Sequence, residues 1–387
     1  MKRYNTACVF TAACAGMGFF GVTMLSLGPI LTELSQIVEG ANALPATMSI
    51  GIIMGTIIFG PIVDRLGYKW LLIAASLMAL AGVQGLAQFD SIDLLHCSIF
   101  LLGMGGGILN GETNALVSAI YSDERRGGRL GVLGAFYCIG ALLWISLVYL
   151  CPDFYLPLNA ISVVMAAFIV FFIAIPFPKA EAATEQQRQP LSASLGLLKY
   201  PALLAFALAL FFQCGFEGIS GNFTVAFLNS TTDLDPGLVT LSLTWFSIGM
   251  LCGRLPLGAF MRRFNPMGTL YMYLCVAMAG VALLFTFDTL SIIYLAMALI
   301  GFGVGATFPV VINYLAEAFP RQSGTALSIA MFLGLMGQFA FNKVAGLAFD
   351  DGEYAWFPIM LAGALVGIMA LIPTAVSMVS RRQTSTL

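Results

Sequence analysis

The chain has 387 residues, of which 59% are hydrophobic and 9% are charged, and its formal net charge is −2. A water-soluble domain of this length carries far more charged surface, so the composition excludes a soluble protein and predicts a membrane protein. Eight cysteines show no CxxC pair and no metal-ligand spacing. We therefore expect neither a disulfide framework nor a metal site.

Apolar stretches of spanning length, which takes about 20 residues, follow one another along the chain. The first half has stretches at 6–31, 43–63, 70–89, 94–121, 127–151 and 155–176. The second half has stretches at 200–228, 237–261, 268–287, 290–316, 322–348 and 354–378. The first run is too long for a typical signal-peptide core, so we expect it to be retained. The sequence predicts an all-α membrane protein with twelve transmembrane helices.

The segment 177–199 is the long polar stretch of the chain. It predicts a cytoplasmic linker between a six-helix bundle at 1–176 and a second six-helix bundle at 200–387. No loop is long enough for a nucleotide-binding domain, and the chain has no P-loop, which excludes ATP-driven transport by this chain alone. No nucleophile–base or metal constellation is visible either, so we expect no enzyme activity. We also expect no nucleic-acid partner.

Glycines repeat at an offset of 198 residues between the two halves. The pairs are Gly51 and Gly249, Gly55 and Gly253, Gly60 and Gly258, and the ladder Gly103, Gly105, Gly107 with Gly301, Gly303, Gly305. The chain is therefore two copies of one unit. In an apolar chain this repeat predicts two membrane bundles facing each other, the usual architecture of a solute carrier.

The basic residues test this topology. With both termini in the cytoplasm, sixteen of the seventeen Lys and Arg residues fall on the cytoplasmic side, while the outer loops carry acidic residues. The positive-inside rule requires this pattern, and adding or removing one helix would destroy it.

The loop between the second and third spans reads Gly60-Pro-Ile-Val-Asp64-Arg65-Leu-Gly67-Tyr-Lys69. It resembles the signature loop of the major facilitator superfamily, and the span count and repeat extend the resemblance over the whole chain. The second copy has Arg262 where Asp64 stands, so only the first half has the complete motif.

The resemblance implies contacts for this loop. It places the Asp64 carboxylate near Arg321, at the cytoplasmic start of the eleventh span, where an anion meets the positive end of a helix dipole. It also places the basic residues of the loop, Arg65 and Lys69, near acids between the fourth and fifth spans, where Asp123 and Glu124 are available to Arg65. We expect these contacts to close the inner side of the carrier, the alternative being a charged turn without a gating role.

A narrower resemblance points to the fucose–proton symporter family. It lies in three segments, 103–114, 216–222 and 316–327, of which the first includes Glu112 and the second Glu217. The sugar permeases of that family carry an aspartate in the first helix, whereas residues 23–29 here contain no ionisable group. The fifth helix lacks the Gly-Pro motif typical of drug–proton antiporters, which disfavours drug efflux.

Three ionisable residues lie within predicted spans, away from their cytoplasmic ends: Glu112, Glu217 and Lys343. A charge at the bilayer centre costs about 2.5–3.5 kcal/mol, so such side chains face protein or water. Glu217 lies on one face of the seventh helix, in a stripe of polar or small residues with Gln213, Ser220, Gly221 and Thr224. Such a stripe lines a cavity or forms a tight helix seam. Because desolvation disfavours its charged form, we expect Glu217 to bind a proton near neutral pH and to couple transport to protons.

Glu112 lies two residues from both Asn110 and Asn114, on nearly the opposite face of the fourth helix. One helix cannot direct both faces into one cavity. Either Glu112 lines the cavity, couples protons and contacts the solute while the asparagines join helices, or the reverse holds. The resemblance favours the first alternative.

Amide and aromatic side chains at membrane depth suit a hydroxylated solute, because amides hydrogen-bond hydroxyl groups and rings stack on sugar faces. The candidate solute-binding residues are Glu112, Asn110, Asn114, Gln213, Tyr137, Trp245, Gln338, Asn342 and Lys343. Lys343 either enters the cavity or extends to the outer surface towards Asp350 or Asp351.

Together these features predict a secondary transporter of the bacterial inner membrane that acts as a monomer and imports a sugar or other small polar solute. We expect a proton gradient as its energy source and no cofactor. The alternatives are a proton-coupled exporter of the same fold and a non-transporting membrane receptor. The receptor is disfavoured because polar groups line helices in both halves.

Overall fold

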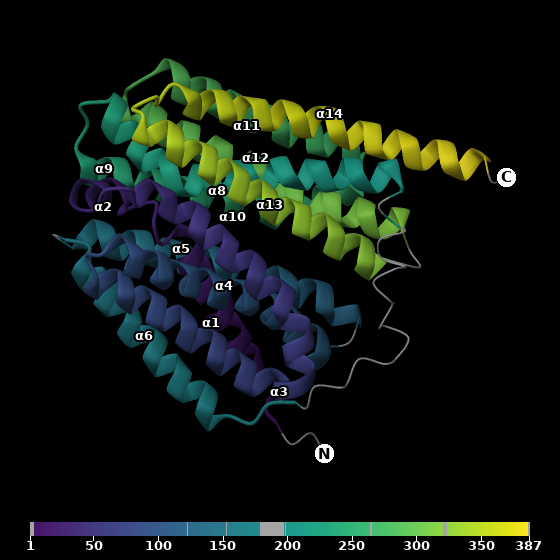
Figure 1. The fold of residues 1–387 in the computed structure, drawn as a ribbon. Helices are drawn as coiled ribbons and strands as arrows, with labels where there is room; N and C mark the ends of the chain where they lie inside the picture. Colours follow the sequence, from purple (N-terminus) through teal and green to yellow (C-terminus); the bar gives the residue numbers. More distant parts are fainter. Residues whose placement is uncertain are drawn as a thin grey trace. The chain divides into compact units, whose positions relative to one another are not determined.

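The computed structural model describes residues 4–121, 123–151, 153–178, 197, 199–263, 265–319 and 323–385 (Figure 1). Within these residues, twelve helices are long and apolar enough to cross a membrane. The predicted all-α class and the number of spans are confirmed.

The chain forms two compact units. Unit 1 comprises residues 1–182 together with 221–229 and 233–244, and unit 2 comprises residues 183–220, 230–232 and 245–387. The helix that opens the second predicted bundle is thus shared between the two units.

The helices of the first half alternate with short connections. They are α1 (Thr6–Leu25), the short α2 (Leu31–Ile37), α3 (Leu44–Gln88), α4 (Ile92–Ile120), α5 (Asp123–Leu150) and α6 (Tyr155–Ala174). A single 3₁₀ turn, Ala41–Ala43, precedes α3. The Asn5 side chain caps α1 by accepting hydrogen bonds from the amides of Ala7 and Cys8, two of the first-turn N–H groups that have no partner within a helix.

The second half has the same succession of long helices. They are α8 (Pro201–Thr231), the short α9 (Pro236–Thr240), α10 (Ser242–Arg263), α11 (Pro266–Thr286), α12 (Leu290–Ala318), α13 (Ser323–Asp350) and α14 (Trp356–Ser385). Two of these helices begin with a proline that follows a capping side chain, Asp235 for α9 and Asn265 for α11. Proline suits this position because its fixed φ is helical and its missing N–H would have no partner.

Helix α3 contains two spans, because its backbone leaves the helical conformation at Gly67. The φ and ψ angles of Gly67 are 73° and 164°, a conformation that side chains rarely allow and that glycine adopts at little cost. The two candidate spans of this region cover Ala41–Phe59 and Arg65–Gln88, and Gly67 lies near the start of the second. The second glycine of the signature loop therefore makes the turn between the second and third spans.

Repeated glycines lie where helices touch backbone to backbone. In unit 1, a Cβ atom placed on Gly103 of α4 would overlap the carbonyl oxygen of Met48 in α3. In unit 2, a Cβ atom on Gly301 of α12 would overlap the carbonyl oxygen of Phe246 in α10. The two contacts are equivalent at the offset of 198 residues. The glycine repeat in the sequence is therefore a repeat of one helix seam, which we call the glycine seam.

Candidate functional site

The two polar stripes of α4 lie in different environments. The Glu112 side chain has no exposed surface, whereas Asn114 is exposed and Asn110 is half-buried. Helical spacing already separates Glu112 from the two asparagines. The structure adds that the carboxyl side is the one that packs inside unit 1.

Glu112 is buried between α4 and the second span of α3. The backbone of Leu72 lies beside its carboxyl group, and two turns earlier on the same face Gly105 packs against Ala75 and Ala79. Neither carboxyl oxygen has a hydrogen bond of good geometry to a described residue. Burying a polar group without a hydrogen bond is unfavourable, and burying an unpaired charge is far more so.

The opposite face of α4 presents amide groups. The Asn114 amide nitrogen donates to the Asn110 carbonyl oxygen at 2.8 Å, and the Ser118 hydroxyl donates to the Asn114 carbonyl oxygen at 2.8 Å. These bonds leave the side-chain oxygen of Asn114 and the side-chain nitrogen of Asn110 without a partner among the described residues. A hydroxylated ligand could therefore find an acceptor and a donor one helical turn apart.

In unit 2, Gln213 lies in a helix seam. Its side chain has no exposed surface, and its amide nitrogen donates to the Val304 carbonyl oxygen of α12 at 3.3 Å. Its side-chain oxygen is buried and has no partner among the described residues. Glu217, one turn further along α8, is half-buried.

Two amides of α13 pack next to Glu217. Gln338 is 3% exposed and Asn342 is fully buried. A Cβ atom placed on Gly218 of α8 would lie 2.9 Å from Cγ of Gln338 and 3.2 Å from Nδ2 of Asn342. The structure thus brings Gln338 and Asn342 to the part of α8 that carries Glu217. Lys343 is exposed.

The candidate aromatic residues differ in exposure. Tyr137 of α5 is 8% exposed, and its ring centroid lies 5.5 Å from that of Phe20 in α1. Trp245 of α10 is 41% exposed and stacks on Tyr294 of α12 at 6.0 Å with an interplanar angle of 28°. Of the two, Trp245 presents the larger open ring surface.

The signature loop makes a contact that the sequence did not indicate. The Lys69 ammonium group donates to two backbone carbonyls at the end of α6, those of Ile173 at 2.7 Å and Ile175 at 3.0 Å. Arg65 is exposed.

The remaining predicted gating contacts cannot be located. The side chains of Asp64, Asp123 and Glu124 lie outside the described side chains. Arg321 lies outside the described residues. The predicted contacts of the loop with these residues stay predictions.

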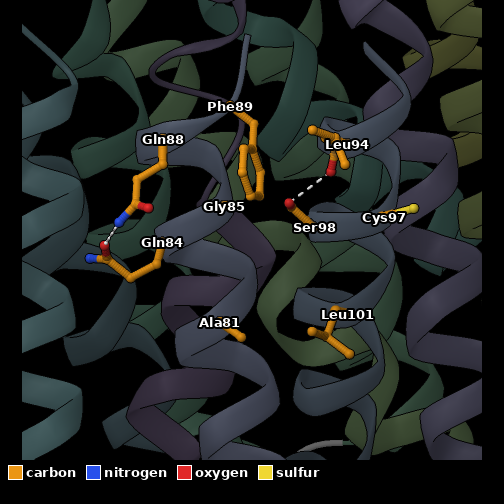
Figure 2. Close-up of a pocket in the computed structure, with 9 residues that line it drawn as sticks. All are labelled: Ala81, Gln84, Gly85, Gln88, Phe89, Leu94, Cys97, Ser98 and Leu101. Carbon is orange, nitrogen blue, oxygen red and sulfur yellow. Dashed lines mark hydrogen bonds between the residues drawn. The ribbon is translucent and has the colours of Figure 1, made fainter. Parts of the chain in front are cut away.

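A groove lies at the far end of α3 and α4 from Glu112 (Figure 2). It has a volume of about 440 Å³, and one wall carries the hydrogen-bonded pair Gln84 and Gln88 while Ser98 lies on the other. Glu112 follows Ser98 by fourteen residues, about 21 Å along the axis of α4 at 1.5 Å per residue. The groove is therefore separate from the predicted site residues.

Among the described residues, no group of three His, Cys, Asp or Glu side chains could hold a metal ion.

These observations define the class of protein. Twelve apolar helices, a glycine seam repeated in both units and carboxyl groups at membrane depth are the features of an integral membrane protein of the transporter type. The family model of the Major Facilitator Superfamily matches residues 8–342. The chain belongs to this superfamily.

Similar proteins are distant in sequence and close in fold. The uncharacterized MFS-type transporter YfkF of Bacillus subtilis is 23% identical over 320 residues, which cover 78% of each chain. A crystal structure of a D-xylose–proton symporter superposes with a TM-score of 0.74 at 15% identity, covering 95% of this chain and 98% of that one. The fucose:proton symporter FucP of E. coli superposes with a TM-score of 0.63 at 17% identity, with the same coverage. The predicted superfamily is confirmed.

Proposed function

We propose that this protein is a proton-coupled secondary transporter that imports a sugar or a related hydroxylated solute by alternating access. The observation that carries the proposal is Glu112, a carboxyl group with no exposed surface and no hydrogen bond of good geometry to a described residue. An unpaired carboxylate in such a place is strongly disfavoured, so the group holds a proton whenever it is enclosed. A transporter that carries a proton with its solute needs such a group.

Glu217 is the second acidic group of the proposed mechanism. It is half-buried, and the amides of α13 pack beside it. Protonation removes the charge of such a carboxyl group, so that the loaded carrier can change conformation without burying a charged side chain. We propose that Glu217 exchanges the coupled proton, because it has the solvent access that Glu112 lacks.

The asparagine face of α4 is the proposed contact for the solute. Asn110 and Asn114 offer a donor and an acceptor that no described residue uses, and a pair of adjacent sugar hydroxyl groups needs such a combination. The two solved symporters, which are named for D-xylose and for fucose, support a sugar as the solute class. That Glu112 also touches the solute stays a prediction.

The test uses purified protein and proteoliposomes. Thermal-shift screening against D-xylose, L-fucose, D-glucose, D-gluconate and L-serine first identifies a stabilising solute. Import coupled to protons then requires that an outside-acid pH gradient drives accumulation of that solute in right-side-out liposomes, and that a proton ionophore abolishes it. Accumulation that does not depend on the pH gradient would refute proton coupling. Solute movement out of the liposomes, driven by proton entry, would favour the exporter.

A further inference from the structure

The groove between α3 and α4, which we call the α3–α4 groove, has the size and lining of a site for one small ligand (Figure 2). Its volume of about 440 Å³ lies within the range of roughly 300–1,000 Å³ that ligand sites span. Such sites are mostly apolar with a few polar groups, and here apolar walls enclose two glutamines and one serine. Phe89 and Leu94 in these walls are 40% and 46% exposed, so the groove is open to the surroundings of the helices.

The groove lies at the depth where the surface of a membrane meets the helix ends. The second span of α3 ends at Gln88, at the side that the basic residues predict to be outside the cell. The groove follows this helix from Gln88 back to Ala81, about 10 Å at 1.5 Å per residue. Since the hydrocarbon core of a bilayer is about 30 Å thick, this stretch covers the ester groups of one leaflet and the first part of its acyl chains. Phospholipids are the molecules that surround an integral membrane protein at this depth.

The two glutamines of the groove keep hydrogen-bond donors for a ligand. The Gln88 amide nitrogen donates to the Gln84 side-chain oxygen at 2.8 Å, and the Gln84 amide nitrogen donates to the Asn159 side-chain oxygen of α6 at 3.2 Å. An amide nitrogen carries two N–H groups, so each glutamine has one that no described residue uses. The ester carbonyl and phosphate oxygens of a phospholipid accept hydrogen bonds and donate none. The two amides therefore suit the ester region of a lipid.

The charges beside the groove distinguish between phospholipid headgroups. Asp90 lies in the short connection from α3 to α4, Asp93 lies in the first turn of α4, and both are exposed. The lining itself contains no basic side chain. Because opposite charges attract and like charges repel, the two carboxylates favour a headgroup that ends in a protonated amine. They disfavour a headgroup that is negative and carries no cation.

The second copy of the repeat keeps the helix packing of this region. A Cβ atom on Gly82 of α3 would lie 2.6 Å from the carbonyl oxygen of Ser98, and a Cβ atom on Gly280 of α11 would lie 2.6 Å from that of Ala296. Four side chains are also repeated at the offset of 198 residues: Ala81 and Ala279, Phe89 and Phe287, Asp90 and Asp288, and Leu101 and Leu299.

The amides of the groove are not repeated. Ala282 and Thr286 stand in the second copy where Gln84 and Gln88 stand in the first. The first copy thus adds two hydrogen-bonding side chains to an apolar frame that both copies share. Helix packing is kept without these amides in the second copy, so packing alone does not account for them.

We propose that the α3–α4 groove binds one phospholipid with an amine headgroup, such as phosphatidylethanolamine. The apolar walls hold the upper part of an acyl chain, and Gln84 and Gln88 donate to its ester oxygens. Asp90 and Asp93 pair with the ammonium group. A second copy of the chain fits less well, because a stable protein interface buries about 1,600 Å², whereas this groove has the volume of a site for one ligand.

The test uses the purified full-length protein in detergent and follows the groove through Cys97, an exposed thiol in its wall. The rate at which N-ethylmaleimide alkylates Cys97 is measured while phosphatidylethanolamine or phosphatidylglycerol with the same acyl chains is added. Cys275 of α11 is also exposed and is the internal control. Two double variants are compared with the parent protein: Gln84→Ala with Gln88→Thr, which introduces the side chains of the second copy, and Asp90→Asn with Asp93→Asn. Asp288→Asn is the matched control for the acids.

We expect phosphatidylethanolamine to protect Cys97 at a concentration about fivefold lower than phosphatidylglycerol does, a modest preference because exposed ion pairs are weak. Cys275 should respond equally to both lipids. The double glutamine variant should need about tenfold more of either lipid, since it loses hydrogen bonds to the ester oxygens. The double aspartate variant should bind both lipids equally, and Asp288→Asn should keep the preference of the parent protein.

Four results would overturn the proposal. Equal protection of Cys97 by the two lipids, or better protection by phosphatidylglycerol, would exclude recognition of the amine. Unchanged protection in the double glutamine variant would show that the lipid does not contact Gln84 and Gln88. Loss of the preference in Asp288→Asn would assign it to surface charge in general. Protection of Cys97 that rises with protein concentration, without added lipid, would assign the groove to a second copy of the chain.

Discussion

Replacing Glu112 with Met should stabilise the protein and abolish proton-driven accumulation. Glu112 has no exposed surface, and its carboxyl oxygens have no hydrogen bond of good geometry to a described residue. Burying a polar group without a partner costs about 1–3 kcal/mol in protein mutational data. Met has a similar length and no such requirement, so Glu112→Met should raise the free energy of unfolding by about 1–3 kcal/mol. This corresponds to a rise of roughly a few degrees in melting temperature.

The assay pairs stability with transport. Thermal unfolding of purified Glu112→Met in detergent is compared with the parent protein and with Leu116→Met, a fully buried apolar position one turn further along α4. The control exchanges one apolar side chain for another and should cost less than about 1.5 kcal/mol. Accumulation driven by a pH gradient is then measured in proteoliposomes. The expected combination is a more stable protein that no longer accumulates solute, as is common when a functional group is unfavourable for folding.

Two outcomes would refute the reasoning. A loss of stability in Glu112→Met, with Leu116→Met near the parent value, would mean that the carboxyl group makes a favourable contact in the membrane-embedded protein. Normal accumulation by the stabilised variant would mean that Glu112 carries no coupled proton, and Glu217 would then be the sole candidate.

Three further predictions concern other parts of the molecule. Glu217→Gln keeps the shape of the side chain but cannot titrate, so pH-driven accumulation should collapse while energy-independent counterflow survives; accumulation near the parent level would exclude Glu217 as the coupling group. Asp64→Asn should slow exchange of bound solute and leave equilibrium binding nearly unchanged, and a fall in affinity by orders of magnitude with normal exchange would contradict the gating role. Gly249→Ala places a Cβ atom onto the Ala298 carbonyl oxygen, so thermal unfolding should show a destabilisation of about 1–3 kcal/mol, whereas Gly363→Ala, whose added Cβ meets no atom within 4 Å, should be near neutral.

The fold could be predicted from the sequence because membrane spans are set by length and polarity alone. Each apolar run of about 20 residues must become a helix in the bilayer, where backbone groups have no other partner. The runs at 43–63 and 70–89 predicted two spans, and the backbone of α3 leaves the helical conformation between these runs, at Gly67. The intervening signature loop marked the boundary, and Gly67 is the residue that makes the turn there.

The candidate site was harder to predict because helical spacing relates side chains on one helix but does not name the neighbouring helix. The spacing placed Glu112 opposite Asn110 and Asn114 on α4, and burial was needed to tell which face is enclosed. Similarly, Gln213 belonged to a stripe that could line a cavity or a seam. Its bond to the Val304 carbonyl, 91 residues away, is a seam contact.

Contacts between side chains and distant backbone are the part that no sequence pattern reveals. Lys69 was expected to act near acidic side chains, as the superfamily resemblance implies, but its described partners are carbonyl oxygens. Every residue offers a backbone carbonyl, so composition cannot single out the one that a lysine will reach.

The glycine seam also limits how the two copies of the ancestral unit could diverge. At Gly103 and Gly301, any mutation adds atoms where a carbonyl oxygen of the facing helix already lies. Side chains that meet lipid can change freely, whereas these positions admit glycine alone without a shift of the backbone. After the duplication, sequence changes in the two copies were therefore concentrated on the helix faces outside the glycine seam. The helix contacts of the seam therefore stayed the same in both copies, while one copy kept its complete signature loop and the other replaced it.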